Sequence, residues 1–125
     1  MSKVLLVEDD PFLSSLLKNR LQKENLEVVY SRDGEEALNA LKTDVVDLVL
    51  LDIILPKKSG FEVMEEIRND PQIQGKGMPV IIISNLGQPD DMAKGQQLGA
   101  VEYFVKAKTS IDDLVEKIKE FINNK

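Results

Sequence analysis

The chain has 125 residues, 42% of them hydrophobic and 30% charged, and its formal net charge is −6 at pH 7. This length and composition predict one globular domain, spanning residues 1–125, with a sizeable core that needs no disulfides. The absence of cysteine and histidine excludes thiolate metal sites and any catalytic or phosphate-carrying imidazole, and the acidic charge disfavours nucleic acid or an anionic membrane as the main partner.

The N-terminal segment predicts a buried strand followed by a helix. Val4 to Val7 is an uninterrupted apolar run, and the acids Glu8, Asp9 and Asp10 follow it directly. Asp10 before Pro11 is a typical helix start, with a capping side chain and proline in the first helical position. The leucines expected on the inner face of this helix are Leu13, Leu16, Leu17 and Leu21.

The next strand and helix follow the same plan, although the strand is less apolar. Glu27 to Ser31 is a short and rather polar strand, which predicts a position near an edge of the sheet. Asp33 and Glu36 form a capping pair at the start of the following helix. The residues expected to face the core from this helix are Ala37, Leu38 and Leu41.

The middle of the chain predicts a central strand and a third helix. Val46 to Leu51 is apolar apart from Asp47, and Asp52 follows it directly. Ser59 and Glu62 have the spacing of a capping box, which marks the start of the helix. The residues expected on the inner face of this helix are Phe61, Met64 and Ile67.

A predicted loop separates the third helix from the fourth strand. Pro71 and the Gly-Lys-Gly stretch at 75–77 indicate this loop. Val80 to Ile83 is the most β-branched segment and predicts a buried strand. Pro89 can open a fourth helix, which Gly95 weakens because glycine has a low helix propensity.

The C-terminal segment predicts the last strand and the last helix. Val101 to Val105 reads as a strand, and Lys106 follows it directly. Ser110 and Asp113 have the spacing of a helix cap. The apolar face expected on this last helix consists of Ile111, Leu114, Val115, Ile118, Phe121 and Ile122.

Strands and helices alternate five times along the chain, which predicts an α/β fold: a five-stranded parallel sheet with helices on both faces. Right-handed crossovers place the carboxyl end of every strand at one edge of such a sheet. The polar residues that end or follow strands should therefore meet there, although they are far apart in sequence. These residues are Glu8, Asp9, Asp52, Ser84 and Lys106.

The residue types at this edge indicate phosphoryl transfer. Carboxylates such as Glu8, Asp9 and Asp52 are hard oxygen ligands of the kind that Mg²⁺ takes, whereas no histidine or cysteine is present to bind zinc. A metal ion would also relieve the repulsion among these acids. Lys106 can offset the charge of an incoming anion, Ser84 can donate a hydroxyl, and Asp52 at the end of the central strand is the natural acceptor.

The chain resembles the receiver domains of bacterial two-component response regulators over essentially its whole length, and among them the stand-alone, chemotaxis-regulator-like members. The residues that carry the resemblance are Val7-Glu8-Asp9-Asp10, Asp52-Ile53-Ile54-Leu55-Pro56 with Gly60, Val80 to Ser84, and Tyr103-Phe104-Val105-Lys106. The order and spacing of these four motifs make the resemblance specific. It implies a flavodoxin-like receiver fold with strand order 2-1-3-4-5.

The resemblance also implies roles for the residues around the acceptor. Asp52 would accept a phosphoryl group from the phosphohistidine of a sensor kinase. Glu8 and Asp9 resemble the acidic pair that holds Mg²⁺, together with Asp52 and the backbone carbonyl of Ile54.

Three further residues resemble the switch elements of the family. Ser84 matches the hydroxyl that turns toward the phosphoryl group, Lys106 the lysine that pairs with it, and Tyr103 the aromatic residue whose ring moves inward with Ser84. Each also has a plainer interpretation: a strand-terminal hydroxyl, a counter-charge for the acids, and a half-buried strand aromatic.

The chain departs from the family pattern at three places. Ala107 replaces the usual proline after the lysine, so we expect either a trans bond at Lys106-Ala107 or a strained cis bond. Asn85 replaces a small residue and would narrow access to the phosphoryl site. Ile54 and Leu86 are apolar where polar groups could orient an attacking water, which predicts slow hydrolysis of the phosphorylated form.

The resemblance implies protein partners: a sensor histidine kinase or a phosphotransfer protein as donor, and a downstream protein target. We expect a monomer or a phosphorylation-linked dimer that catalyses only its own phosphorylation and dephosphorylation, and signals through the fourth helix, last strand and last helix. No apolar run could span a membrane and no signal peptide precedes Glu8, so we expect a cytoplasmic protein without a membrane partner. The few residues after the last predicted helix suggest a stand-alone receiver, with a fragment of a longer protein as the open alternative.

Other functions fit the sequence less well. A phosphatase of the haloacid dehalogenase type would need an acid where Ile54 stands, and a flavin site would need a phosphate-binding loop in place of Glu8 to Asp10. A phosphorylation-independent adaptor with a receiver fold is the remaining alternative, and the presence of Asp52 and Lys106 speaks against it.

Overall fold

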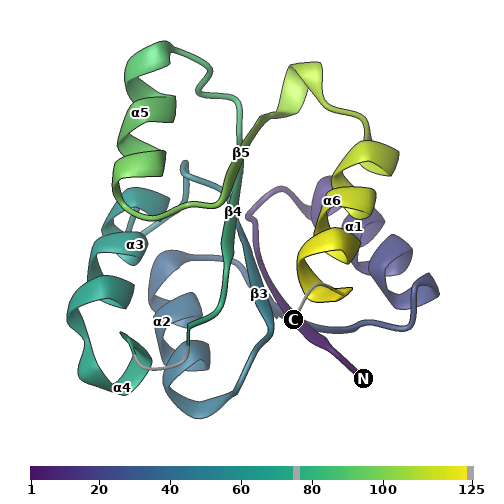
Figure 1. The fold of residues 1–125 in the computed structure, drawn as a ribbon, viewed down its shortest axis with the longest axis horizontal. Helices are drawn as coiled ribbons and strands as arrows, with labels where there is room; N and C mark the ends of the chain where they lie inside the picture. Colours follow the sequence, from purple (N-terminus) through teal and green to yellow (C-terminus); the bar gives the residue numbers. More distant parts are fainter. Residues whose placement is uncertain (75–76, 124–125) are drawn as a thin grey trace.

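The computed structural model describes residues 1–74 and 77–123, and these form one parallel sheet with helices on both faces (Figure 1). The strands are β1 (Lys3–Val7), β2 (Glu27–Ser31), β3 (Leu48–Leu51), β4 (Val80–Ser84) and β5 (Glu102–Val105). Their order is β2-β1-β3-β4-β5, and every neighbouring pair is parallel. The predicted order 2-1-3-4-5 is thereby confirmed, as is the edge position of β2.

The helices form a layer on each face of the sheet. Their bounds are α1 (Pro11–Lys23), α2 (Gly34–Thr43), α3 (Gly60–Asn69), α4 (Pro71–Gln74), α5 (Pro89–Gln97) and α6 (Ile111–Asn123), with a short 3-10 turn, η1 (Lys106–Lys108), after β5. Figure 1 shows α2, α3, α4 and α5 on one side of the sheet and α1 and α6 on the other. No helix among the described residues has the length and apolar character needed to cross a bilayer.

Two hydrophobic clusters lie between the sheet and the two helix layers. Alternate residues of the strands belong to different clusters. Leu5 and Val7 of β1 face α2 and α3, whereas Val4 and Leu6 face α1 and α6. This alternation follows from the strand geometry, in which successive side chains point to opposite faces. A strand that is apolar throughout, as β3 is and as β1 is from Val4 to Val7, is therefore buried on both sides.

The helix starts follow the sequence signals closely. Asp10 caps α1 by accepting hydrogen bonds from the N–H groups of Phe12 and Leu13, so its side chain serves the helix. A capping box of Ser59 and Glu62 opens α3 as predicted. Such caps satisfy backbone donors that have no partner within the helix.

Two local predictions are wrong. Leu16 is 47% exposed, because the stripe that packs against the sheet consists of Leu13, Leu17 and Leu21, four residues apart. The loop predicted at Pro71 begins with the helical turn α4, which the fully buried side chain of Ile73 anchors to the core. The same loop prediction extends to residues 75 and 76, which lie outside the described part of the chain.

Gly95 has a packing role that its helix propensity does not suggest. A Cβ atom at this position would lie 2.8 Å from Cδ1 of Ile82 and 3.0 Å from the ring of Tyr103. Glycine therefore allows α5 to approach β4 and β5 closely. Weakness of the helix is not needed to explain this residue.

Candidate functional site

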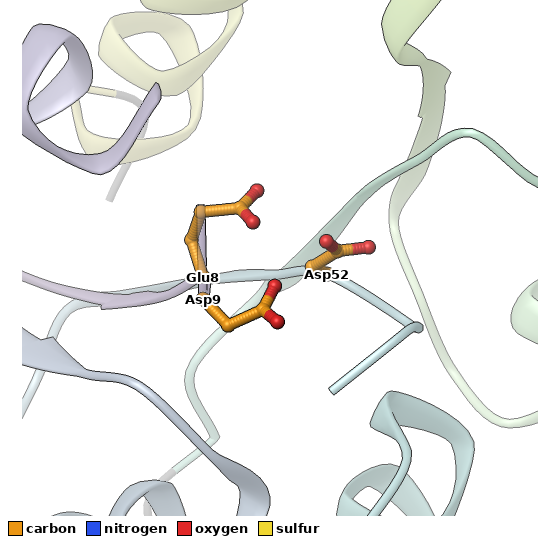
Figure 2. Close-up of side chains that lie close together, drawn as sticks. All are labelled: Glu8, Asp9 and Asp52. Atoms are coloured by element: carbon orange, nitrogen blue, oxygen red, sulfur yellow. The ribbon is translucent and has the colours of Figure 1, made fainter. Parts of the chain in front are cut away.

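Three acidic side chains meet at the carboxyl edge of the sheet. Glu8 and Asp9 follow β1, and Asp52 follows β3, which is its neighbour; the Asp52 N–H donates to the carbonyl of Val7 at 3.0 Å. One carboxylate oxygen from each acid lies within 4.8 Å of the others. Figure 2 shows the side chains of Glu8 and Asp9 pointing toward Asp52. The predicted convergence of these acids is thus observed.

Lys106 brings an ammonium group into contact with both Glu8 and Asp52. It follows β5, which is separated from β3 by β4, and its Nζ lies 2.8 Å from Glu8 Oε1 and 2.9 Å from Asp52 Oδ2. Glu8 is fully buried and Asp52 nearly so, whereas Asp9 is exposed. The site is therefore closed on the side of the sheet and open at Asp9.

Burial and neighbouring charges shift the pKa values of Glu8 and Lys106. Burial raises the pKa of Glu8 above its ordinary value, and the charge of Asp52 adds to the rise, while Lys106 and the backbone N–H of Asp10 oppose it. For Lys106 burial acts to lower the pKa, but contacts with Glu8 and Asp52 outweigh it and raise the pKa. Lys106 is therefore cationic at neutral pH, and ionised Glu8 has a cost that a further nearby cation would relieve.

The donor atoms fit a small divalent cation such as Mg²⁺. The Oε1 atom of Glu8 is buried and has no hydrogen-bond partner among the described residues, and its contact with Lys106 is an ion pair. Oδ2 of Asp52 accepts a hydrogen bond from Nζ of Lys106, and Oδ1 of Asp52 accepts one from the N–H of Ile54 at 3.3 Å. All the acidic donors are hard oxygens, and the exposed Asp9 leaves room for metal-bound waters.

Ser84 and Tyr103 both contact the backbone of Leu86, in the loop after β4. The hydroxyl of Ser84, which is fully buried, accepts from the Leu86 N–H at 3.2 Å, and the Tyr103 hydroxyl donates to the Leu86 carbonyl at 2.6 Å. Burial and the charge of Asp91 raise the pKa of Tyr103, so its hydroxyl keeps its proton. The two predicted switch residues, Ser84 and Tyr103, thus form hydrogen bonds to the backbone of the same loop residue. The sequence did not indicate this common partner.

The remaining predicted positions are placed as follows. Ile54 is 55% exposed and follows Asp52 by two residues. The Lys106-Ala107 bond is trans, like every peptide bond in the described part of the chain, and η1 continues the path. The roles assigned to Asp52, Glu8, Asp9, Ile54, Ser84, Lys106 and Tyr103 stay predictions.

Sequence reasoning missed one contact to the acidic pair. The hydroxyl of Tyr30 on β2 donates to the backbone carbonyl of Glu8 at 2.8 Å. No local pattern marks a tyrosine on an edge strand for such a role, because the contact depends on how β2 pairs with β1. Only the register of the two strands brings these residues together.

Comparisons with known proteins identify a family that the chain matches. The family model described as response regulator receiver domain matches residues 4–119. The transcriptional regulatory protein CpxR of Klebsiella pneumoniae is 44% identical over 106 residues, which cover 85% of this chain and 43% of that protein. The transcriptional regulatory protein CiaR of Streptococcus pneumoniae is 41% identical over 106 residues, 85% of this chain and 45% of that protein. The chain thus spans less than half the length of these curated relatives.

Solved structures show the same fold. The receiver domain of the Francisella response regulator 1452 has a TM-score of 0.90 and 26% identity, with 99% of this chain and 98% of that chain covered. A CheY-like response regulator receiver domain protein from Methanospirillum hungatei has a TM-score of 0.89 and 27% identity, with 99% and 95% covered.

Replacement of Lys106 by methionine tests the electrostatics of the cluster. We expect Lys106→Met to lower the free energy of unfolding at neutral pH by about 3 kcal/mol, because two buried carboxylates lose their ammonium partner. The pKa of Glu8 already lies above its unfolded value, so its ionisation costs stability as the pH rises through that pKa, and removal of Lys106 increases this cost. The loss should therefore be larger at neutral pH than at acid pH, as measured by urea denaturation without Mg²⁺.

Lys117→Met is the matched control, because the ion pairs of Lys117 with described residues, Glu102 and Glu120, lie at the surface. Its effect should be below about 1 kcal/mol at either pH. Equal losses for the two variants, or a Lys106→Met loss that does not change with pH, would contradict this account of the cluster.

Proposed function

The chain belongs to the response regulator receiver domain family, and on this premise we propose that Asp52 accepts a phosphoryl group from the phosphohistidine of a sensor histidine kinase or a phosphotransfer protein. The observation that carries the proposal is that the Asp52 carboxylate lies 2.9 Å from Nζ of Lys106 and within 4.8 Å of carboxylate oxygens of Glu8 and Asp9. These 125 residues contain no histidine, so none of them can supply the donor imidazole.

In the proposed reaction, a carboxylate oxygen of Asp52 attacks the phosphorus while the bond from phosphorus to the donor imidazole breaks, and the imidazole leaves. The reaction depends mainly on positioning and on neutralisation of charge. Lys106 would pair with an oxygen of the bound phosphoryl group. Glu8, Asp9, Asp52 and the backbone carbonyl of Ile54 would hold Mg²⁺, which supplies further positive charge next to the phosphoryl oxygens.

The contacts of Leu86 support a switch that follows phosphorylation. Ser84 would give up the N–H of Leu86 and donate its hydroxyl proton to a phosphoryl oxygen, which frees the loop after β4. Tyr103, bonded to the carbonyl of the same residue, would then change position with the loop. The surface formed by α5, β5 and α6 would change as a result, and a downstream protein would bind it.

Phosphorylation by a small-molecule donor tests the central claim. After incubation with acetyl phosphate and Mg²⁺, intact mass spectrometry should show the gain of one phosphoryl group on the unaltered chain. Asp52→Ala should gain none, because no other carboxylate in the described part of the chain lies in such a cluster of acids with a lysine. Asp90→Ala is the control, since Asp90 is exposed on α5 and should not affect the gain. Modification of Asp52→Ala to the same extent would refute the assignment of the acceptor.

Thermal unfolding tests the metal site separately. Mg²⁺ should raise the melting temperature by a few degrees, because binding to the folded state at ten times the dissociation constant contributes about 1.4 kcal/mol. Asp9→Ala should lose most of this response, whereas Asp112→Ala, an exposed position on α6, should keep it. If Mg²⁺ leaves the melting curve of the unaltered chain unchanged, the proposed metal site is wrong.

The apolar residues beside the acceptor predict a long-lived phosphorylated form. Ile54 is exposed at the mouth of the site and Leu86 is half-buried in the neighbouring loop, so neither side chain can orient an attacking water. Phosphate release should therefore take minutes or longer, and Ile54→Asn should shorten the lifetime several-fold. A lifetime of seconds for the unaltered chain would rule this prediction out.

A further inference from the structure

One short segment of the chain contacts both loops that carry the proposed metal donors. It consists of residues 30–34, from the end of β2 to the first residue of α2, and is called the β2–α2 segment below. On one side it contacts the loop after β1, which contains Glu8 and Asp9. On the other side it contacts the loop after β3, which contains Ile54.

In the contact with the loop after β1, both backbone polar groups of Glu8 form hydrogen bonds. Its N–H donates to the carbonyl of Ser31 at 3.1 Å, and its carbonyl accepts from the Tyr30 hydroxyl at 2.8 Å. The Ser31 bond continues the parallel ladder of β1 and β2, as the register Val7↔Ser31 requires. The Tyr30 bond is additional to the ladder and comes from a residue that is 37% exposed.

The contact with the second loop depends on Gly34, the first residue of α2. Its N–H donates to the carbonyl of Pro56 at 3.4 Å. A Cβ atom at Gly34 would lie 2.6 Å from the Cβ of Lys58 and would collide with the Lys58 carbonyl oxygen. Nearby, Nζ of Lys57 lies 3.8 Å from Oδ2 of the buried Asp33. Only glycine permits this close approach of helix and loop.

We propose that Tyr30 and Gly34 are positioning residues for the metal site, acting through the two loops that the β2–α2 segment contacts. Metal coordination depends on the separation of donors to within a few tenths of an ångström, and Mg²⁺ is especially demanding. Tyr30 holds the backbone from which Glu8 and Asp9 project, and Gly34 holds the loop that brings Ile54. This inference rests on the proposed function, because it assigns residues to the same Mg²⁺ site.

The variant Tyr30→Phe separates positioning from general stabilisation, since it removes one hydroxyl and keeps the ring. The dissociation constant for Mg²⁺ is measured by the shift of backbone amide NMR signals, without a phosphoryl donor. We expect this constant to rise roughly two- to tenfold, the range expected for one lost hydrogen bond. In acetyl phosphate reactions, the Mg²⁺ concentration for half-maximal rate should rise by the same factor, while the rate at saturating Mg²⁺ stays unchanged.

Leu41→Ala is the matched control for stability. Leu41 is fully buried on α2, the helix that Gly34 begins, so its truncation should lower the melting temperature while leaving the Mg²⁺ dissociation constant unchanged. Gly34→Ala supplies the second arm: where it folds, its Mg²⁺ dissociation constant should rise at least as much as that of Tyr30→Phe, because the added Cβ pushes the loop away.

The outcomes distinguish this inference from the proposed function. If the unaltered chain binds Mg²⁺ and Tyr30→Phe binds it equally well, the positioning role of Tyr30 is refuted and the proposed function stands. A lower rate at saturating Mg²⁺ with an unchanged dissociation constant also refutes it, since Tyr30 would then act on the chemical step. If the unaltered chain neither binds Mg²⁺ nor becomes phosphorylated, the proposed function fails and this inference fails with it.

Discussion

Lys106 lies between the buried carboxylates of Glu8 and Asp52, and the carboxyl edge of the sheet depends on this contact. One ammonium group faces two buried acids, with a third acid, Asp9, at the open side. The cluster therefore keeps an excess of negative charge, which burial makes costly. The same excess suits the site to bind a divalent cation. The electrostatic cost of the cluster and its suitability for a divalent cation thus have the same origin, which is the excess of buried negative charge.

Leu86 connects this edge to the helical layer. Its N–H donates to the hydroxyl of Ser84 and its carbonyl accepts from the hydroxyl of Tyr103, so both side chains are bonded to the same loop residue. The ring of Tyr103 also packs against α5, where Gly95 leaves room for it. Helix α5 is held in turn by α3, through Lys94 over the ring of Phe61 and through Arg68, which donates to the carbonyl of Gln97. Contacts therefore run without a break from Ser84, at the end of β4, through Leu86 and Tyr103 to α5 and on to α3.

Family membership and the details of this chain account for different features. The fold and the order of the motifs are shared with receiver domains, over residues 4–119. Ala107 after the lysine and the apolar Ile54 beside the acceptor are departures from the pattern that the sequence already revealed. The hydrogen bond from Tyr30 to Glu8 is a further feature, visible only in the structure. The proposals above assign the lifetime of the phosphorylated form to Ile54 and part of the metal affinity to Tyr30.

The sequence by itself determined the strands, most helix starts, and the meeting of Glu8, Asp9, Asp52 and Lys106. The strand order followed from the family resemblance. Caps and apolar runs are local signals, and parallel crossovers then leave one edge for every strand end. Only the tertiary structure decided that Leu16 is exposed, that α4 forms, that Gly95 serves packing, and that Tyr30 holds Glu8. Each of these depends on distances between segments that are remote in the chain, and such distances leave no local pattern in the sequence.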